Sequence, residues 1–529
     1  MSSLNLLRIL FLFCGCGLVT VELLFSRRIK LFRNFSFSLL YFWGGINILF
    51  IIFLWFNHIN FPLFVDLMEG VVFQHFQHAV AFQPIYPAAT PEYVPLAYNP
   101  LFYVISLPFG WIFGVQLSTL RLVAILGMLG CAAVSFLMIR RETGSARWAF
   151  LTVGVFAAAY SVMDAYLDSA HSDSWLLFTA LLGTYLISLN RSRKLDLLGL
   201  LVLIASFWFK QHGALFVVGG VLFLTWRHGI KKSIVYWVVA VLFGPVLYLF
   251  GGPALFGSNF LQFTWEIPRN WSELNWQTFL RILVFILKSY PVLALASGIL
   301  VVWMGLRNRS QFNVWHLQYF FACFSGMMGS LDAGSSNNVF VSMGMWFILL
   351  GMLGLFELKK RFPALTVKYA ILQYSLVITL AFLLYNPLSM ITSPRAHESY
   401  QDLIAFINSL DGTVYAPTLG QLPKDFVFYP AAHWVALEDM IRGPGRDTRN
   451  HPNTRLLLEP TLNPQGSAYI LANYPLEVYP WLDFLNDYYV LEQDLEGRFE
   501  PLRVLPKRWD HGWPRYLYRY EPNISNENR

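Results

Sequence analysis

The densest group of residues suited to acid–base chemistry follows the second long apolar segment of the chain. Asp66 and Glu69 stand three positions apart in the run 62–70, and a helix-like stretch, 71–82, comes next. On a helix this spacing puts both carboxylates on one face. Near a membrane surface, partial desolvation would make either group a better acceptor for a hydroxyl proton. A helix cap, with Asp66 as the cap residue and Glu69 three positions later, is the alternative interpretation.

Two histidines on the helix-like stretch are candidate metal ligands. His75 and His78 are three positions apart, and Glu69 lies on the same expected helix. Imidazole and carboxylate groups commonly bind divalent metals. Two histidines at this spacing on a surface helix more often belong to its polar face. The sequence therefore leaves a divalent metal as an alternative and requires no cofactor.

A second polar group lies in a short turn between two apolar segments. The run 166–173 contains Asp168, His171 and Asp173 within eight residues. Helix termination would explain one of these side chains but not all three. Ionisable groups at the ends of membrane helices are costly and are therefore functional candidates.

Two further groups of polar residues also lie at the ends of apolar segments. Lys210 and Gln211 stand between two very apolar segments. The ammonium of the lysine could bind a phosphate as a point charge, or it could extend to the membrane interface. The run 334–338, which ends in Asn338, offers amides and hydroxyls, although taken alone it is an ordinary turn.

The composition indicates which elements must position these groups. Of 529 residues, 56% are hydrophobic and only 13% are charged, against roughly 25% charged in soluble domains. The net charge of +7 is spread over short clusters between apolar runs, which argues against a nucleic-acid-binding face. All four cysteines lie inside apolar segments, so neither a disulfide nor a zinc site is expected. We predict a polytopic membrane protein.

A membrane-spanning helix needs about 20 mostly apolar residues, and about twelve segments fit that template. The first is predicted to be retained as an anchor because it has no small-residue cleavage site. The predicted spans are 5–25, 36–57, 118–139, 148–166, 174–190, 195–209, 213–226, 233–250, 282–304, 313–330, 338–357 and 367–388.

Short basic connections predict the orientation, because such loops stay in the cytoplasm. They follow every second predicted span, at 27–33, 140–147, 191–194, 227–232, 307–309 and 359–361. This alternation holds only if the apolar run 100–114 does not cross the membrane, so an interfacial or re-entrant helix is predicted there. All the polar groups described above then lie on the extracytoplasmic side.

The chain becomes polar and rich in proline after about residue 389. A helix-like stretch at 397–410 and strand-like runs at 413–417, 468–472 and 516–520 predict a small α/β domain on the same side. The expected organisation is two N-terminal transmembrane helices (1–57), a first outer loop with interfacial helices (58–117), a helix bundle (118–388) and an extracytoplasmic domain (389–529).

The polar groups, taken in order, resemble the motifs of C-type (GT-C) membrane glycosyltransferases. The similarity is to bacterial family 39-like enzymes, which are related to protein O-mannosyltransferases and lipid A aminoarabinose transferases. It extends over about residues 40–390 and rests on Asp66-x-x-Glu69-Gly70, Glu92 to Tyr103, Phe113-Gly114, Leu120-Arg121-Leu122, His171-Ser172-Asp173, Lys210-Gln211 and Gly334 to Asn338.

The resemblance implies an all-α polytopic fold of about 12 transmembrane helices with a small C-terminal α/β extracytoplasmic domain. It implies a carboxylate base among Asp66 and Glu69, and an acceptor or loop role for Glu92 and Tyr98. The residues expected to bind the donor phosphate or sugar are Lys210, Gln211, His171, Asp173, Arg121 and Asn338.

The chain departs from the family pattern at two positions. Met68 stands where the catalytic aspartate usually precedes the glutamate, so Asp66 or Glu69 must take that role if the chain is active. His171 replaces an expected arginine, and it would contact phosphate when protonated.

The resemblance therefore implies an inverting transfer of a monosaccharide from a polyprenyl-phosphate carrier to a lipid, glycan or protein acceptor. The expected location is a bacterial inner membrane, with the site on the periplasmic side. Two other functions remain open. One is a lipid-linked sugar flippase or secondary transporter, and the other is a polysaccharide polymerase or ligase. An inverted repeat would favour a transporter, and none is evident in the sequence.

Overall fold

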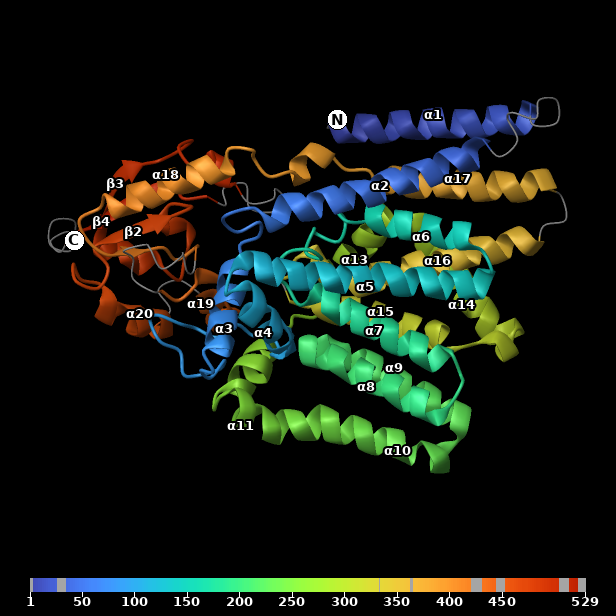
Figure 1. The fold of residues 1–529 in the computed structure, drawn as a ribbon, viewed down its shortest axis with the longest axis horizontal. Coiled ribbons are helices and arrows are strands. Elements are labelled where there is room, and N and C mark those ends of the chain that lie inside the picture. The colour runs from blue at the N-terminus through green and yellow to red at the C-terminus, as the bar shows by residue number, and fades with distance from the viewer. Residues whose placement is uncertain are drawn as a thin grey trace.

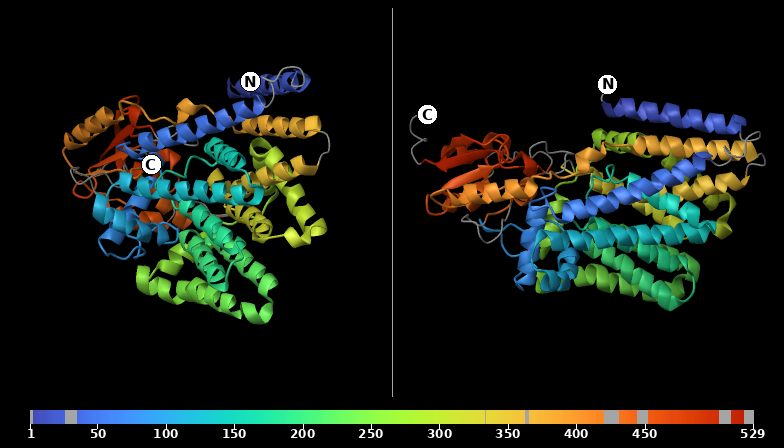
Figure 2. Two further views of the ribbon diagram at one scale, coloured as in Figure 1. Left: turned by 45° about the vertical axis from the view of Figure 1, so that its right-hand side comes forward. Right: turned by 45° about the horizontal axis from the view of Figure 1, so that its top comes forward.

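Long helices run side by side in the computed structural model, and a small α/β region lies beyond one end of them (Figure 1). Both further views show the same division (Figure 2). The structure describes residues 3–25, 35–332, 334–361, 365–419, 431–443, 452–503 and 513–521.

A helix occupies every segment that is predicted to span. In chain order these helices are α1 (Ser3–Phe25), α2 (Phe35–Ile59), α5 (Leu117–Thr143), α6 (Ala146–Ala158), α7 (Asp173–Ser188), α8 (Arg193–Phe209), α9 (Ala214–His228), α10 (Ile230–Val241), α14 (Pro291–Arg307), α15 (Val314–Ser330), α16 (Val341–Arg361) and α17 (Leu365–Leu383). A π-helical stretch, η3 (Leu242–Gly251), continues α10.

Not all of these helices are long enough to cross a bilayer on their own. By length and composition, five described helices qualify, or six if one sharply bent pair counts as a single span. Several others are shorter; α6 has 13 residues and α9 has 15, against the roughly 20 that a full crossing needs. The fold is a polytopic helical bundle whose members differ in length.

Two predicted spans need correction. The segment 282–304 is not one helix, because α13 (Trp276–Ser289) and α14 meet at a bend of 103°. Pro291 begins α14, and proline removes a backbone donor and restricts the residue before it. The segment 148–166 is helical only to Ala158, and turns follow.

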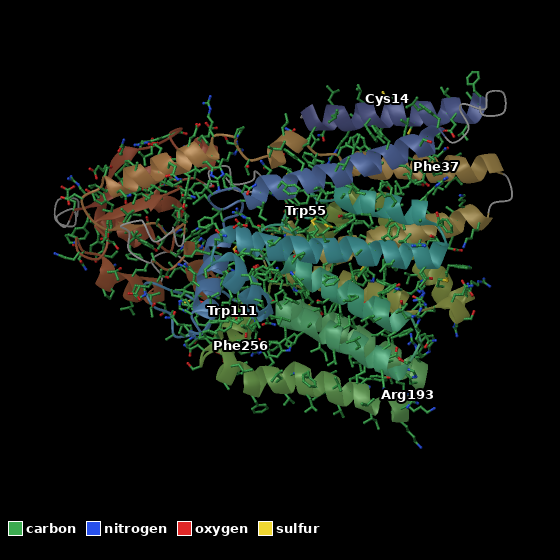
Figure 3. The ribbon with its side chains drawn as sticks, in the orientation of Figure 1. Cys14, Phe37, Trp55, Trp111, Arg193 and Phe256 are labelled. Carbon is green, nitrogen blue, oxygen red and sulfur yellow. The ribbon has the colours of Figure 1, made fainter. Side chains whose placement is uncertain are left out.

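The basic connections share one end of the bundle. The links between α5 and α6, α7 and α8, and α9 and α10 all lie opposite the C-terminal α/β region (Figure 1). Arg193, at the start of α8, marks that end (Figure 3). This arrangement agrees with the predicted alternation of basic loops. The basic segment 27–33 lies outside the described residues.

Two short helices pack on each other at the end of the bundle that carries the α/β region. They are α3 (Glu69–Val80), which lies across the helix ends in Figure 1, and α4 (Leu101–Phe113). At about 1.5 Å per residue, the 13 residues of α4 cover about 20 Å, less than the roughly 30 Å of a hydrocarbon core. The helix predicted over 100–114 is therefore too short to cross. The short helices α11 (Gly252–Phe256) and α12 (Ile267–Arg269) come later in the chain.

The C-terminal region combines helices with a mixed sheet. Its helices are α18 (Ala396–Asn408), α19 (Trp434–Ile441) and α20 (Pro452–Leu458), and its strands are β1 (Val414–Tyr415), β2 (Tyr469–Ala472), β3 (Tyr489–Asp494) and β4 (Tyr516–Tyr520). The strand order is β1-β2-β4-β3; β1 runs parallel to β2, and the other pairs are antiparallel. The sequence predicts β1, β2, β4 and α18, and it misses β3.

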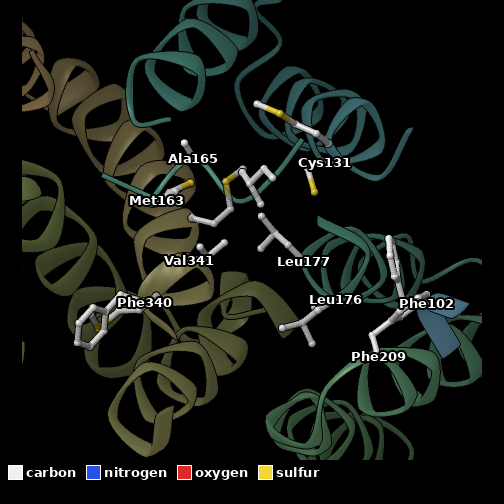
Figure 4. Close-up of a cluster of buried hydrophobic side chains, with 14 of the residues drawn as sticks. Phe102, Cys131, Met163, Ala165, Leu176, Leu177, Phe209, Phe340 and Val341 are labelled. Atoms are coloured by element: carbon white, nitrogen blue, oxygen red, sulfur yellow. The ribbon is translucent and has the colours of Figure 1, made fainter. Parts of the chain in front are cut away.

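Two apolar clusters hold the helix bundle together and join its first loop to the C-terminal region. In the bundle, Leu176 and Leu177 of α7 lie in a buried cluster with Cys131 of α5 (Figure 4). Beyond the bundle, Phe64 of the segment after α2 belongs to the same buried cluster as Leu403 of α18. The first loop is thereby packed into the C-terminal region.

Candidate active site

Seven separate parts of the chain line one cavity of about 710 Å³. They are the segment before α3, the segment before α4, the turn before α7, the connection from α8 to α9, the segment 264–272, the end of α15 with the loop that follows it, and α19. The polar residues that the sequence singles out and that line this cavity are Asp66, Tyr98, His171, Lys210, Gln211 and Asn338. Groups far apart in the sequence thus meet at one place.

Asp66 presents a carboxylate to this cavity. Its Oδ1 accepts hydrogen bonds from the Met68 backbone N–H at 2.8 Å and from His171 Nε2 at 3.0 Å. The side chain keeps 18% of its surface exposed. Within the described part of the chain Oδ2 has no hydrogen-bond partner. The helix α3 begins at Glu69 with Met68 as its cap residue, so Asp66 holds a turn before the helix and does not cap it.

Glu69 lies beneath Asp66, fully buried and outside the cavity lining. Its carboxylate accepts two hydrogen bonds from Arg121, at 3.0 and 2.6 Å. It also accepts from the backbone N–H groups of Val65 and Ala170, at 2.9 and 2.8 Å. A buried carboxylate whose two oxygens are both occupied by donors has no route to an acceptor hydroxyl. We conclude that Glu69 joins the segment before α3 to the turn before α7.

Arg121 is as fully buried as its partner. Besides Glu69, its guanidinium donates to the backbone carbonyls of His58, Phe61 and Leu63. The expectation that Arg121 binds the donor phosphate therefore does not fit its position. Its side-chain nitrogens all donate to atoms of the chain itself. Arg121 therefore holds the segment between α2 and Asp66 in place.

A chain of charged and polar groups leads from Asp66 to Lys210. His171 Nδ1 lies 3.7 Å from Asp173 Oδ2. Lys210 Nζ contacts both carboxylate oxygens of Asp173, at 2.9 and 2.8 Å, and lies 4.6 Å from the centre of the Tyr98 ring. His171, Asp173 and Lys210 are almost completely buried. Lys210 is consequently held in place by an acid and an aromatic face while it lines the cavity.

The other sequence-predicted residues divide between the cavity and its supports. Gln211 Nε2 donates to the carbonyls of Ala97 and Thr264, both at 2.8 Å, so it joins two parts of the cavity wall. The Asn338 backbone N–H donates to Asp164 Oδ2 at 3.1 Å. Glu92 is exposed and lies outside the cavity lining.

The backbone before His171 adopts an uncommon conformation. Asp164 and Ala165 have φ values of 58° and 57°. Two successive residues with side chains in the left-handed region are unfavourable and need support from their surroundings. Asp164 Oδ2 receives that support from Ser336 Oγ at 3.0 Å. The turn before α7 is thereby tied to the loop between α15 and α16.

The alternative of a metal bound by Glu69, His75 and His78 does not match the geometry. His75 is buried; its Nδ1 donates to the Val71 carbonyl at 2.8 Å, and its Nε2 accepts from the Leu96 N–H at 2.8 Å. Burial lowers the pKa of His75 to about 3, which keeps the ring neutral. Glu69 is engaged by Arg121 instead. Among the described residues, no three His, Cys, Asp or Glu side chains are placed to hold a metal.

A charged cluster that the sequence does not predict also lines the cavity, at α19 and in the loop after α15. Arg442 forms ion pairs with Asp332 and with Asp439, both at 3.1 Å, and its guanidinium lies 3.9 Å from the centre of the Trp271 ring. Burial raises the pKa of Asp439 to about 7 against the opposing effect of Arg442, and burial likewise raises the pKa of Glu438. The spacing Glu438-Asp439-x-x-Arg442 on α19 was the available signal.

One further cation belongs to the cavity lining. Arg269, the last residue of α12, is exposed, and within the described residues it has no ion pair. It was overlooked because it stands alone in a long polar connection. Exposed guanidinium groups bind phosphate oxygens in a bidentate manner.

Two solved structures of ArnT from Cupriavidus metallidurans, one bound to undecaprenyl phosphate and one in the apo state, are similar over 91% of this chain and 99% of theirs. The identities are 14% and 15%, and the TM-scores are 0.48 and 0.47. ArnT is a lipid A aminoarabinose transferase, one of the enzymes that the sequence motifs resemble. At these identities and TM-scores, the similarity supports no statement about the activity of this chain. No protein-family model and no curated protein matches it.

The cavity therefore combines a partly exposed carboxylate, Asp66, with a fixed ammonium, Lys210, and an exposed guanidinium, Arg269. A carboxylate with one free oxygen is suited to accept a proton. Cations in a site of low water content stabilise developing negative charge on a departing oxygen. The arrangement is suited to a displacement at a carbon that carries an anionic leaving group.

Proposed function

We propose that this chain is an integral membrane glycosyltransferase that transfers a monosaccharide from a polyprenyl-phosphate carrier to a hydroxyl of a lipid, glycan or protein acceptor. The observation that carries the proposal is the convergence on one cavity of motifs that resemble those of C-type glycosyltransferases. Asp66, His171, Lys210 and Asn338 come from four different parts of the chain, yet all four line it.

Asp66 is the base in this proposal. Its free Oδ2 removes the proton of the acceptor hydroxyl while the acceptor oxygen attacks the anomeric carbon. The bond between that carbon and the phosphate oxygen breaks, and the polyprenyl phosphate leaves with the electron pair. Attack from the face opposite the leaving group inverts the anomeric configuration. General-base catalysis of this kind contributes roughly 10²- to 10⁴-fold to the rate.

Glu69 and Arg121 have a positioning role. Their buried ion pair, together with the hydrogen bonds to Val65 and Ala170, holds the segment that carries Asp66 against the turn that carries His171. Of the two carboxylates that the sequence leaves open, the proposal takes Asp66 as the base, because only Asp66 lines the cavity.

Lys210 and Arg269 bind the donor phosphate in this proposal. Asp173 and Tyr98 fix the ammonium of Lys210 at the cavity wall, while Arg269 is exposed and able to meet a lipid headgroup. Trp265, four residues before Arg269, lines the same cavity with an exposed apolar side chain and offers the lipid tail an apolar approach to it.

The site opens on the extracytoplasmic side in this proposal. Its support is the distribution of charge, since the basic connections lie at the opposite end of the bundle (Figure 1). The acceptor then meets α19 of the C-terminal region, where Glu438 and Asp439 offer carboxyl groups to its hydroxyls.

A transfer assay with the purified full chain tests the proposal. The donors are polyprenyl phosphates carrying different radiolabelled monosaccharides, and the acceptor is an extract of membrane lipid and glycan. Asp66→Asn is the test variant, and Asp402→Asn is the matched control because Asp402 is exposed on α18, outside the cavity. Labelled product from the parent chain and from the control, and none from Asp66→Asn, supports the proposal. Labelled carrier that crosses a proteoliposome membrane without product formation identifies a flippase instead.

A further inference from the structure

A second cavity lies at the opposite end of the bundle, between the ends of α5 and α7. It measures about 420 Å³ and is lined by Leu137, Arg140, Arg141, Tyr185, Leu189 and Arg191. The catalytic proposal uses none of these residues. The guanidinium groups of three arginines gather around this one cavity.

One of the arginines is a structural cap. Arg141 donates to the Ser188 carbonyl at 3.0 Å and to Ser188 Oγ at 3.2 Å, at the C-terminal end of α7. Glu142, the next residue in the chain, also interacts electrostatically with Arg141. The charge of Arg141 is therefore largely balanced within the chain.

The other two arginines are not balanced in this way. Arg140 and Arg191 are exposed, and within the described part of the chain neither guanidinium forms an ion pair or a hydrogen bond. Asn190, with φ of 50°, turns the chain after α7, which brings Arg191 to the cavity that Arg140 lines. Two planar donors are thus directed at one space.

The position of the cavity along α5 indicates the environment of these groups. The 27 residues of α5 extend over about 40 Å, whereas a bilayer core is about 30 Å thick. Arg140, in the last turn, lies at headgroup depth when the helix crosses the membrane. Leu137, one turn earlier, keeps 44% of its surface exposed, as expected for an apolar side chain at the edge of the hydrocarbon core. An adjoining apolar edge suits a lipid and offers nothing to a small soluble anion.

We propose that this cavity binds the phosphate-bearing headgroup of an anionic phospholipid, with Arg140 and Arg191 as phosphate ligands and Leu137 against the acyl chain. Basic pockets between transmembrane helices on the cytoplasmic side favour such headgroups. Tyr185 closes the cavity from α7 and adds a hydroxyl. The proposal does not depend on the glycosyltransferase activity.

Native mass spectrometry of the purified full chain tests the proposal. The probes are phosphatidylglycerol, cardiolipin, phosphatidylcholine and inorganic phosphate. The test variant is the double substitution Arg140→Gln/Arg191→Gln. The matched control, Arg193→Gln/Lys231→Gln, removes the same charge from two exposed positions in the first turns of α8 and α10. Arg193 marks the same end of the bundle (Figure 3).

We expect the parent chain to retain the anionic lipids in preference to phosphatidylcholine, and millimolar inorganic phosphate not to displace them. The test variant should bind the first anionic lipid roughly tenfold to thirtyfold more weakly, since each basic group near an anionic headgroup contributes about 1 kcal/mol. The control should change this affinity less than about twofold. An equal loss in test and control variants, or displacement by inorganic phosphate alone, overturns the lipid assignment.

The variant Arg140→Lys/Arg191→Lys separates charge from geometry. Lysine preserves the charge but cannot form the bidentate contact. Intermediate affinity between parent and glutamine variant supports direct phosphate contact. Affinity equal to that of the glutamine variant, together with an unchanged thermal unfolding midpoint, contradicts it.

Discussion

His171 Nε2 lies 3.0 Å from Asp66 Oδ1, although the two residues are 105 positions apart in the chain. Since Oδ1 is occupied by His171 and by the Met68 N–H, Oδ2 is the oxygen left for a substrate. The histidine therefore fixes which way the carboxylate faces. His171 is therefore the positioning partner of the proposed base.

Substitution of His171 should reduce the rate in proportion to the lost hydrogen bond. His171→Leu removes a donor to a charged group, for which about 1.5–3 kcal/mol is typical, so kcat/KM should fall roughly tenfold to a hundredfold. His171→Gln keeps an N–H donor and should recover much of that loss. Initial rates with a saturating acceptor measure both variants. Equal activities in the two would contradict a positioning hydrogen bond.

Glu69 should contribute to the stability of the fold and not directly to the transfer step. Glu69→Gln leaves the guanidinium of Arg121 buried without its countercharge, and breaking such a pair costs about 3–5 kcal/mol. A double-mutant cycle with Arg121→Met should show that the two losses are not additive. Unfolding in detergent, followed by tryptophan fluorescence, provides the four free energies. A Glu69→Gln chain that is as stable as the parent and inactive would make Glu69 the base.

Arg269 should affect the binding of the donor and leave the transfer step unchanged. Arg269→Gln removes one exposed cation, which is worth at most about 1 kcal/mol, so KM for the donor should rise up to about fivefold at unchanged kcat. The effect should shrink as salt is added, because exposed charges are screened. Arg395→Gln, on an exposed residue outside the cavity, is the control. A change confined to kcat would be inconsistent with a phosphate contact.

The unfolding midpoint of the chain should depend on pH through Asp439 of the C-terminal region. Burial raises the pKa of this carboxyl to about 7 in the folded chain, from an ordinary value of 3.8. Between about pH 4 and 7 the folded state retains a proton that the unfolded state has lost, so the stability contribution falls as the pH rises. Asp439→Asn stays neutral, and the parent should lose stability relative to it from pH 5 to pH 8. A difference in unfolding midpoint that is constant across this range would contradict the raised pKa.

The sequence predicts the helices well because long apolar runs leave few alternatives. It also places Asp66, His171 and Lys210 on one side of the membrane, and the structure brings them together. The different surroundings of Asp66 and Glu69 were not predictable, since the pairing of Glu69 with Arg121 spans 52 positions. Spacing on one helix says nothing about a buried partner from another.

Other features escaped the sequence for local reasons. Asp164 is not a glycine, so its left-handed conformation has no compositional signal. The ion pairs of Arg442 join α19 to a loop more than 100 positions earlier, at Asp332, and in sequence α19 resembles any amphipathic surface helix. The part that α19 plays in lining the cavity follows from the packing of the C-terminal region against the bundle, which the sequence alone does not reveal.

The most direct test of Asp66 as the base compares donor binding with single-turnover transfer in the parent chain and in Asp66→Asn. A polyprenyl-phosphate sugar that supports transfer is bound first, and excess acceptor is then added. The account predicts that Asp66→Asn binds the donor within about threefold of the parent, as expected for a group that acts mainly in the transition state. Its transfer step should be slower by roughly 10²- to 10⁴-fold. Transfer by Asp66→Asn at the parent rate would contradict the central claim.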